Sequence, residues 1–258
     1  MLKNKKGIIF GIANDHSIAW GIAKKLTENC AEIGITYQNN TLLKRVKPLA
    51  EKINSNFLIQ CDFSQKNSIK KCFKEIKKKF HKIDFIIHAA AYSDKNELNG
   101  KYLNTSKDNF INTLNISCFS FTEISKEASK IMNVGGSLLT LSFYGSNKVM
   151  PNYNVMGVAK AALETSVKYL SVDLGAQKIR VNAISAGPMR TLAGAAIANA
   201  RDVYNYTQLN SPLKRNVNLE EIGNSALYLV SDLSKSVTGE IHYVDCGFNI
   251  IGMPNTNV

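Results

Sequence analysis

Short runs of β-branched and other apolar residues alternate with amphipathic segments along all 258 residues of the sequence. Each run has the length and composition of a strand that is buried on both faces. The predicted strands are residues 7–10, 32–37, 56–60, 83–88, 137–142, 180–184 and 241–244. The predicted helices are residues 17–29, 41–52, 64–80, 106–132, 153–174 and 219–230.

This alternation predicts an α/β fold with a doubly wound, Rossmann-type architecture. We expect a seven-stranded parallel sheet with helices on both faces. No linker, repeat or low-complexity tract divides the chain, so residues 1–258 are expected to form a single domain. Two segments, 92–105 and 185–212, read as irregular and follow predicted strands. Ligands of such sheets bind at the carboxyl ends of the strands, which makes both segments candidate lids rather than plain insertions.

Composition narrows the class of protein. The net charge is +12, and many of the lysines fall in residues 66–82, in one predicted helix. A solvated helix face explains them, and an acidic protein partner is the alternative. Nucleic acid is not expected, because aromatic residues are not interleaved with the lysines. No apolar run reaches the roughly 20 residues that a membrane-spanning helix needs, and residues 1–10 read as a first strand rather than a signal peptide.

The five cysteines are scattered and form no Cys/His cluster. Neither a disulfide framework nor a metal site is expected, and a cytoplasmic location is the default.

The first strand is followed by a turn that starts at Gly11 and ends at Ser17. Gly11 permits a tight turn near a phosphate, and Ser17 can cap the next helix, whose amides and dipole favour a pyrophosphate. Ala13 and His16 depart from the GxGxxG pattern, so a merely capped turn would look the same. Its position at the first strand–helix junction favours nucleotide binding.

The end of the second strand bears on cofactor choice. Gln38 stands where dinucleotide-binding domains place an acid for the adenosine ribose or an arginine for a 2′-phosphate. Its amide offers hydrogen bonds but no charge, which favours NADH over NADPH. Asp62, after the third strand, can accept from the adenine amino group or can cap a helix. Ala90, after the fourth strand, lets the backbone approach a cofactor ribose.

Tyr153 and Lys160 lie seven residues apart at the start of a predicted helix, so both side chains project from one face. A phenol beside a cation can stabilise a developing oxyanion or donate a proton. The spacing occurs by chance in many proteins, but here it follows the fifth strand of a predicted nucleotide-binding fold. The pair is therefore the candidate reaction centre.

With these motifs the chain resembles the NADH-dependent enoyl-acyl carrier protein reductases, a divergent branch of the short-chain dehydrogenase/reductase superfamily. Ordinary members of the superfamily place tyrosine four residues before lysine, where this chain has Met156. The resemblance rests on Gly11 and Ser17, on residues 151–160 and 180–192, and on residues 238–245, which together span most of the chain.

The resemblance implies reduction of the 2,3 double bond of a trans-2-enoyl thioester by NADH, the last reductive step of type II fatty-acid elongation. Tyr153 would stabilise the enolate, and Lys160 would bind the nicotinamide ribose. Ser93 would contact substrate, and about residues 187–212 would form the substrate loop. The residues implied to bind the cofactor are Gly11, Ser17, Ile18, Gln38, Asp62, Phe63, Ala90, Lys160, Met189, Arg190, Thr191, Leu192 and Ala193.

The chain departs from the family pattern at several positions. Phe143 replaces a second tyrosine ten residues before Tyr153 and cannot donate a hydrogen bond. Ala91 replaces a glycine, which we expect to weaken binding of flat phenolic inhibitors such as triclosan. Of the basic cluster that docks the acidic acyl carrier protein, only Arg201 remains, which leaves docking to other lysines. Cys246 replaces a glycine, which suggests a packing change near a subunit contact.

Two alternatives stay open at this point: another divergent short-chain reductase with an enoyl-CoA or carbonyl substrate, and a catalytically inactive nucleotide-binding regulator. The resemblance also implies a homotetramer.

Overall fold

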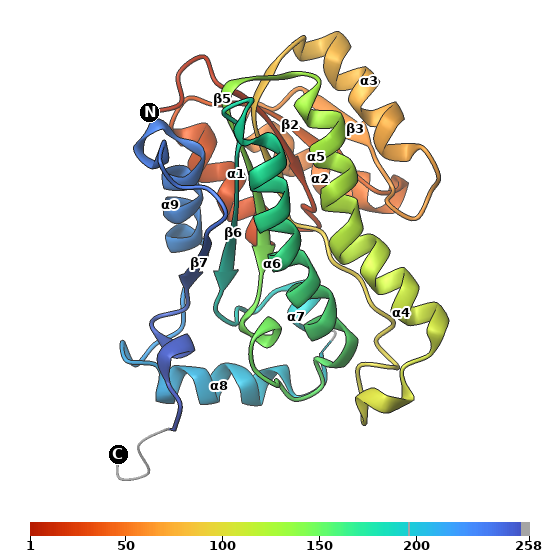
Figure 1. Cartoon of the computed structure of the whole chain (residues 1–258), viewed down its shortest axis with the longest axis vertical. Coiled ribbons are helices and arrows are strands. Elements are labelled where there is room, and N and C mark those ends of the chain that lie inside the picture. The colour runs from red at the N-terminus through yellow and green to blue at the C-terminus, as the bar shows by residue number, and fades with distance from the viewer. Residues whose placement is uncertain (196, 254–258) are drawn as a thin grey trace.

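A computed structural model describes residues 1–195 and 197–253 of the chain, and it shows one sheet covered by helices (Figure 1). The strand order is β3-β2-β1-β4-β5-β6-β7, and every neighbouring pair is parallel. The predicted seven-stranded doubly wound fold is therefore confirmed. The strands are β1 (Lys6–Phe10), β2 (Glu32–Tyr37), β3 (Phe57–Gln60), β4 (Ile83–His88), β5 (Met132–Ser142), β6 (Arg180–Ala186) and β7 (Ile241–Val244).

Helices cover both faces of the sheet, because successive strand residues point to opposite sides. Ile8 packs among side chains of α3, α5 and α6, whereas Ile9 packs among side chains of α1, α2 and α9. The helices are α1 (Ile18–Glu28), α2 (Asn40–Lys52), α3 (Ser68–Phe80), α4 (Lys107–Leu114), α5 (Ser120–Ser129), α6 (Asn154–Gly175), α7 (Leu192–Ala195), α8 (Ala200–Asn210) and α9 (Leu219–Val230).

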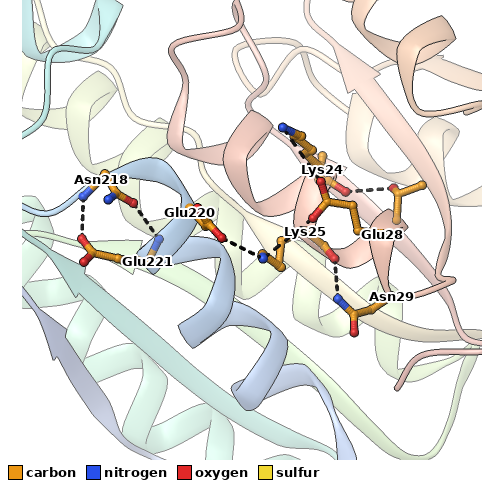
Figure 2. A network of polar contacts seen from close by, with 9 residues as sticks. Lys24, Lys25, Glu28, Asn29, Asn218, Glu220 and Glu221 are labelled. Atoms are coloured by element: carbon orange, nitrogen blue, oxygen red, sulfur yellow. Dashed lines mark hydrogen bonds and ion pairs between the residues drawn. The ribbon is translucent and has the colours of Figure 1, made fainter.

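The helix α1 is held in place by close packing against α9. A Cβ on Gly21 would stand 2.8 Å from Leu219, and one on Gly223 would stand 3.1 Å from the Gly21 carbonyl oxygen. Lys25 then pairs with Glu220 across the helices at 3.4 Å (Figure 2). Glycine at the crossing thus fixes the position of the helix whose N-terminus faces the carboxyl end of β1.

The prediction of one continuous helix over residues 106–132 is wrong. Residues Asn115–Phe119 form a π-helical turn between α4 and α5, and β5 already begins at Met132. The turn has a structural role: the Ser117 hydroxyl accepts a hydrogen bond from the Tyr92 amide at 2.9 Å and donates to the Tyr92 carbonyl at 3.0 Å. It anchors the loop after β4, as π-bulges at functional sites often do.

Two other expectations need correction. The helix predicted from residue 64 begins at Ser68, because residues 64–67 form a turn ordered by Asp62, whose carboxylate accepts from the Ser64 amide and hydroxyl. The segment 185–212, predicted to be irregular, contains α7 and α8. Its alanine-rich and polar composition shows no amphipathic period.

Candidate active site

A cavity of about 1250 Å³ opens at the carboxyl ends of the strands, at the point where the strand order reverses between β1 and β4. This is the position at which doubly wound sheets bind ligands. Many of the implied site residues line it: Gly11, Ser17, Ile18, Ala90, Ser93, Phe143, Tyr153, Lys160, Met189, Arg190, Thr191 and Leu192.

Gly11 brings the first loop against the end of β4. Its φ is +102°, and a Cβ there would lie 2.3 Å from the Ala89 carbonyl oxygen. Only glycine fits both the backbone conformation and this close approach. The first loop therefore runs directly against the end of β4, and both border the cavity.

Ser17 occupies the N-cap position of α1, but its side chain does not cap the helix, and the expected capping role is wrong. Its hydroxyl accepts from the Ala13 amide at 3.1 Å and the Asn14 amide at 2.9 Å, and it donates to the Asn14 carbonyl at 2.6 Å. Ser17 thus closes the loop on itself. No side chain of the described residues covers the helix N-terminus as a cap, which suits an anionic ligand.

Gln38, Asp62 and Phe63 are outside the described lining of the cavity. The Gln38 amide donates to an Asp62 carboxylate oxygen at 3.2 Å, so the two side chains form one polar unit beyond the ends of β2 and β3. Phe63 packs between the rings of Phe10 and His88, with centroids 5.9 and 5.8 Å away. Ala193 falls in α7, and its side chain lies outside the described part of the structure.

Tyr153 is buried at the N-cap of α6. The predicted helix began at Tyr153 itself, whereas the helix in the structure begins one residue later, at Asn154. Burial is the main cause that raises the pKa of its phenol well above the usual range, and the charge of Glu164 adds to it. The phenol is therefore neutral and carries its proton at physiological pH. Phe143 packs edge-on against this ring, with centroids 5.0 Å apart.

Lys160 is buried two turns along α6 and donates from Nζ to the Leu141 carbonyl oxygen at 2.8 Å. Burial lowers the pKa of its ammonium to about 8, and Cys118 and Glu164 oppose the shift. A single hydrogen bond leaves the other two N–H groups of the ammonium available to a ligand. Tyr153 and Lys160 border the same cavity, as expected for a reaction centre.

Tyr144 does not replace the missing second tyrosine. Its ring packs against Phe248, with centroids 5.6 Å apart, and it does not line the cavity in the described structure. Tyr144 therefore does not supply the second phenol that the sequence resemblance leads us to expect beside Tyr153.

An apolar cluster that sequence reasoning did not single out lies beside Tyr153. Leu98 and Met156 are buried there, and Met150 and Ile197 pack against them. All four line the cavity. Three of them come from the irregular segments after β4, β5 and β6, where apolar residues show no period. Their chemistry suits an acyl chain.

Comparison with known proteins decides the family. The model of the enoyl-(acyl carrier protein) reductase family matches residues 11–249.

The chain belongs to the enoyl-(acyl carrier protein) reductase family.

Relatives agree with this membership over nearly the whole chain. The enoyl-[acyl-carrier-protein] reductase [NADH] 2 of Rhizobium meliloti is 58% identical, across 98% of this chain and 95% of that protein. The crystal structure of FabI from Candidatus Liberibacter asiaticus is 56% identical, has a TM-score of 0.96, and covers 98% of both chains. The Anaplasma phagocytophilum reductase, crystallised in complex with NAD, is 51% identical with a TM-score of 0.95, over 99% of this chain and 97% of that one.

The family predicted from residues 151–160 and the flanking motifs is thus confirmed. Within residues 1–195 and 197–253, no helix is both long and apolar enough to cross a membrane. The same ranges contain no group of three His, Cys, Asp or Glu side chains arranged to hold a metal ion.

Proposed function

We propose that this member of the enoyl reductase family reduces the 2,3 double bond of trans-2-enoyl thioesters carried by acyl carrier protein, with NADH as the hydride donor. One observation carries the proposal: Tyr153, Lys160 and an apolar wall border a single cavity at the switch point of a doubly wound sheet. The relatives named above bear the same activity in their names, and one was crystallised with NAD.

The residues present fit a dinucleotide. Gly11 lets the first loop pack directly on the Ala89 backbone, where any Cβ would clash, and the N-terminus of α1 that follows this loop has no side-chain cap. The pyrophosphate would lie there, the adenosine would reach toward Gln38 and Asp62, and the nicotinamide ribose would meet Lys160. Bound in this way, the nicotinamide supplies hydride to C3 of the enoyl thioester.

Tyr153 acts where negative charge develops, on the thioester oxygen of the enolate. Because burial keeps the phenol protonated, its O–H is available to donate to that oxygen. The Lys160 ammonium holds ribose hydroxyls and adds positive potential beside the phenol. Ser93, held near Asn109 at 3.3 Å, faces the cavity beside the loop after β4 and is positioned to contact substrate.

Carrier docking follows from charges at the cavity mouth. Lys95, Arg190 and Arg201 are exposed, line the cavity, and form no ion pair within 4.0 Å in the described structure. Lys95 comes from the loop after β4, and Arg201 comes from α8. The resemblance implies a basic docking cluster, two of whose positions are occupied by Ala198 and Asp202 in this chain. We infer that Lys95 takes over part of the docking charge that these two residues do not supply. The lysine-rich α3 is the rival surface, at the other end of the molecule from α8 (Figure 1).

Two substitutions separate these surfaces. Lys95→Ala should raise KM for the carrier-bound enoyl substrate by about tenfold at low salt, because rim charges act mainly on encounter. Turnover of a small enoyl N-acetylcysteamine thioester should not change. Lys74→Ala on α3 is the matched control, with no expected effect on either substrate. An increase in KM for Lys74→Ala alone would instead place docking on α3.

We also propose a homotetramer in the cytoplasm. Large apolar side chains are exposed along α6, through which we expect subunits to pair, and along α4 and the π-helical turn, which contact α6: Ile111, Phe119, Val158, Tyr169 and Val172. All five cysteines are free thiols, as a reducing compartment favours. Light scattering coupled to gel filtration should give a mass near four times 28.5 kDa. A monomer at micromolar concentration would contradict the assembly.

The activity is tested by NADH oxidation with crotonyl thioesters of acyl carrier protein and of coenzyme A, with mass spectrometry of the product. A saturated acyl-carrier thioester is expected as the main product. Faster reduction of crotonyl-CoA, or of acetoacetyl thioesters, would favour a different divergent reductase. NADH binding with no turnover of any of them would leave a nucleotide-binding regulator.

A further inference from the structure

Glu164 is a buried carboxylate that the proposed chemistry does not use. It lies on α6, one turn after Lys160, and is 8% exposed. One carboxylate oxygen, Oε1, accepts two short hydrogen bonds, from the hydroxyls of Ser142 and Ser146 at 2.5 Å each. The other, Oε2, has a weak contact with the Asn147 amide at 3.4 Å. Glu164 therefore joins α6 to both ends of the segment that follows β5.

The segment between these two serines touches the reaction centre. Phe143 packs on the Tyr153 ring, and a Cβ on Gly145 would lie 2.4 Å from a carbon of that ring. Behind it, a Cβ on Gly157 would lie 2.8 Å from the Gly145 carbonyl oxygen. Residues 143–145 are thus wedged between Tyr153 and the first turn of α6. A shift of the segment would move the phenol with it.

Glu164 and Lys160 clamp the same strand end. Lys160 donates to the Leu141 carbonyl oxygen, and Glu164 accepts from the adjacent Ser142. No ion pair within 4.0 Å joins the two charges among the described residues. The carboxylate acts on the ammonium through space, in a buried setting where such effects are strong.

Other titratable groups near Lys160 and Glu164 come from α6 and from the elements around it. Tyr153 and Lys160 lie on α6 itself, and Tyr243 on β7 reaches the network through a 2.8 Å contact of its hydroxyl with the Asn147 amide. His88 on β4 and Cys118 on the π-helical turn lie near Lys160. The Glu164 charge raises the pKa values of Tyr153, Lys160 and Tyr243. For the two tyrosines, burial raises the pKa and is the larger cause, and the Glu164 charge adds to it. For Lys160, burial lowers the pKa and is the larger cause, and the Glu164 charge opposes it.

We propose that Glu164 is a positioning residue for enoyl reduction: its carboxylate fixes residues 142–146 against the Tyr153 ring and places a negative charge one helical turn from Lys160. This inference rests on the proposed function. A buried carboxylate is costly, but the hydrogen bonds that an ionised oxygen accepts from two hydroxyls are stronger than those an amide oxygen would accept. The negative charge beside Lys160 is what a neutral anchor would not supply.

Three variants separate the two parts of this role. Glu164→Gln keeps the shape and removes the charge. Ser146→Ala removes one anchor and keeps the charge. Glu127→Gln is the matched control, because Glu127 is also a buried helical carboxylate, paired with Lys130 at 2.6 Å on α5 and outside the cavity.

Glu164→Gln should lower kcat by about tenfold or more at pH 6.5, with little change in KM for NADH. Its pH profile should also change. In the wild type the alkaline loss of activity should fall near pH 8, where Lys160 loses its proton. Without the Glu164 charge, this alkaline limb of the pH–kcat profile should move about one pH unit lower. Ser146→Ala should lower kcat without moving the limb, and Glu127→Gln should change neither.

A readout without substrate keeps the inference separate from the proposed function. The aromatic resonances of Phe143 in 13C-phenylalanine-labelled protein report its packing on Tyr153, and they should shift in Glu164→Gln and Ser146→Ala but not in Glu127→Gln. A folded Glu164→Gln enzyme with wild-type kcat, pH limb and resonances would overturn the inference. If Glu164→Gln does not fold, unchanged kcat and resonances in Ser146→Ala overturn the positioning role. Wild-type protein without enoyl reduction would overturn the proposed function instead, whatever the resonances show.

Discussion

The ring of Phe143 stands edge-on against the ring of Tyr153, with centroids 5.0 Å apart and planes inclined by 68°. Phe143 stands where the sequence resemblance leads us to expect a second tyrosine, and with no hydroxyl it contacts Tyr153 by packing alone. Phe143→Tyr should therefore change kcat by less than about threefold, since the enolate partner is Tyr153. Phe143→Ala should lower the free energy of unfolding by about 2 kcal/mol, less than for a fully buried ring. Steady-state kinetics and denaturant unfolding of both variants test this.

Ala91 lines the cavity beside the position expected for the nicotinamide. Removing its methyl group should make room for a flat phenolic inhibitor. Ala91→Gly should bind triclosan about tenfold more tightly than the wild type, an effect typical of one methyl group in a shaped pocket. Inhibition titrations at fixed NADH would measure it, and equal inhibition of the two proteins would refute the steric explanation.

The Gln38–Asp62 unit should set the choice of nicotinamide cofactor. A 2′-phosphate placed near Gln38 would meet the Asp62 carboxylate, one oxygen of which lies 3.2 Å from the Gln38 amide nitrogen. Gln38→Arg should raise kcat/KM for NADPH only modestly, by about fivefold, because Asp62 pairs with the new arginine. Adding Asp62→Asn should raise it further. If the double variant gains nothing, the cofactor's adenosine end lies elsewhere.

His88 should make the fold sensitive to acid. Its imidazole is buried between Thr140 and Ser120, at 2.8 and 2.9 Å, and burial lowers its pKa from 6.5 to about 3. Between these values the unfolded chain takes up a proton that the folded protein does not, so stability falls as pH falls. From pH 7 to 5 the loss should be about 2 kcal/mol.

Unfolding by denaturant at the two pH values measures this loss in the wild type and in His88→Asn. The variant should lose about 2 kcal/mol less than the wild type over the same pH interval, because it lacks the titrating group. Equal losses would assign the acid sensitivity to other residues.

The strands were predictable because each combines a short apolar run with flanking turn residues, and β2 and β4 match the predicted bounds. The early start of β5 was not predictable, because Gly135, at φ +84°, and Gly136 interrupt the apolar run that marks the strand. The π-helical turn was also invisible, since one added residue hardly alters the apolar period of a helix.

The reaction centre was predictable in part. The spacing of Tyr153 and Lys160 placed both on one face of a helix, and both border the cavity. The Ser17 hydroxyl turns back onto Ala13 and Asn14 in its own loop, a local arrangement that competes with helix capping and that residue type alone does not distinguish from it. The burial of Glu164 depends on tertiary contacts that local patterns do not encode. A glutamate on a helix ordinarily faces solvent, so nothing in the sequence marks Glu164 as buried.

Tyr153 is the residue on which the account depends most. Reduction of a crotonyl thioester with NADH deuterated at the transferred position should place deuterium at C3 of the saturated product. Tyr153→Phe, which keeps the ring and its packing, should lower kcat by at least about 100-fold while leaving the Kd for NADH within a few-fold of wild type. A Tyr153→Phe enzyme that transfers deuterium to C3 at the wild-type rate would contradict the proposed mechanism.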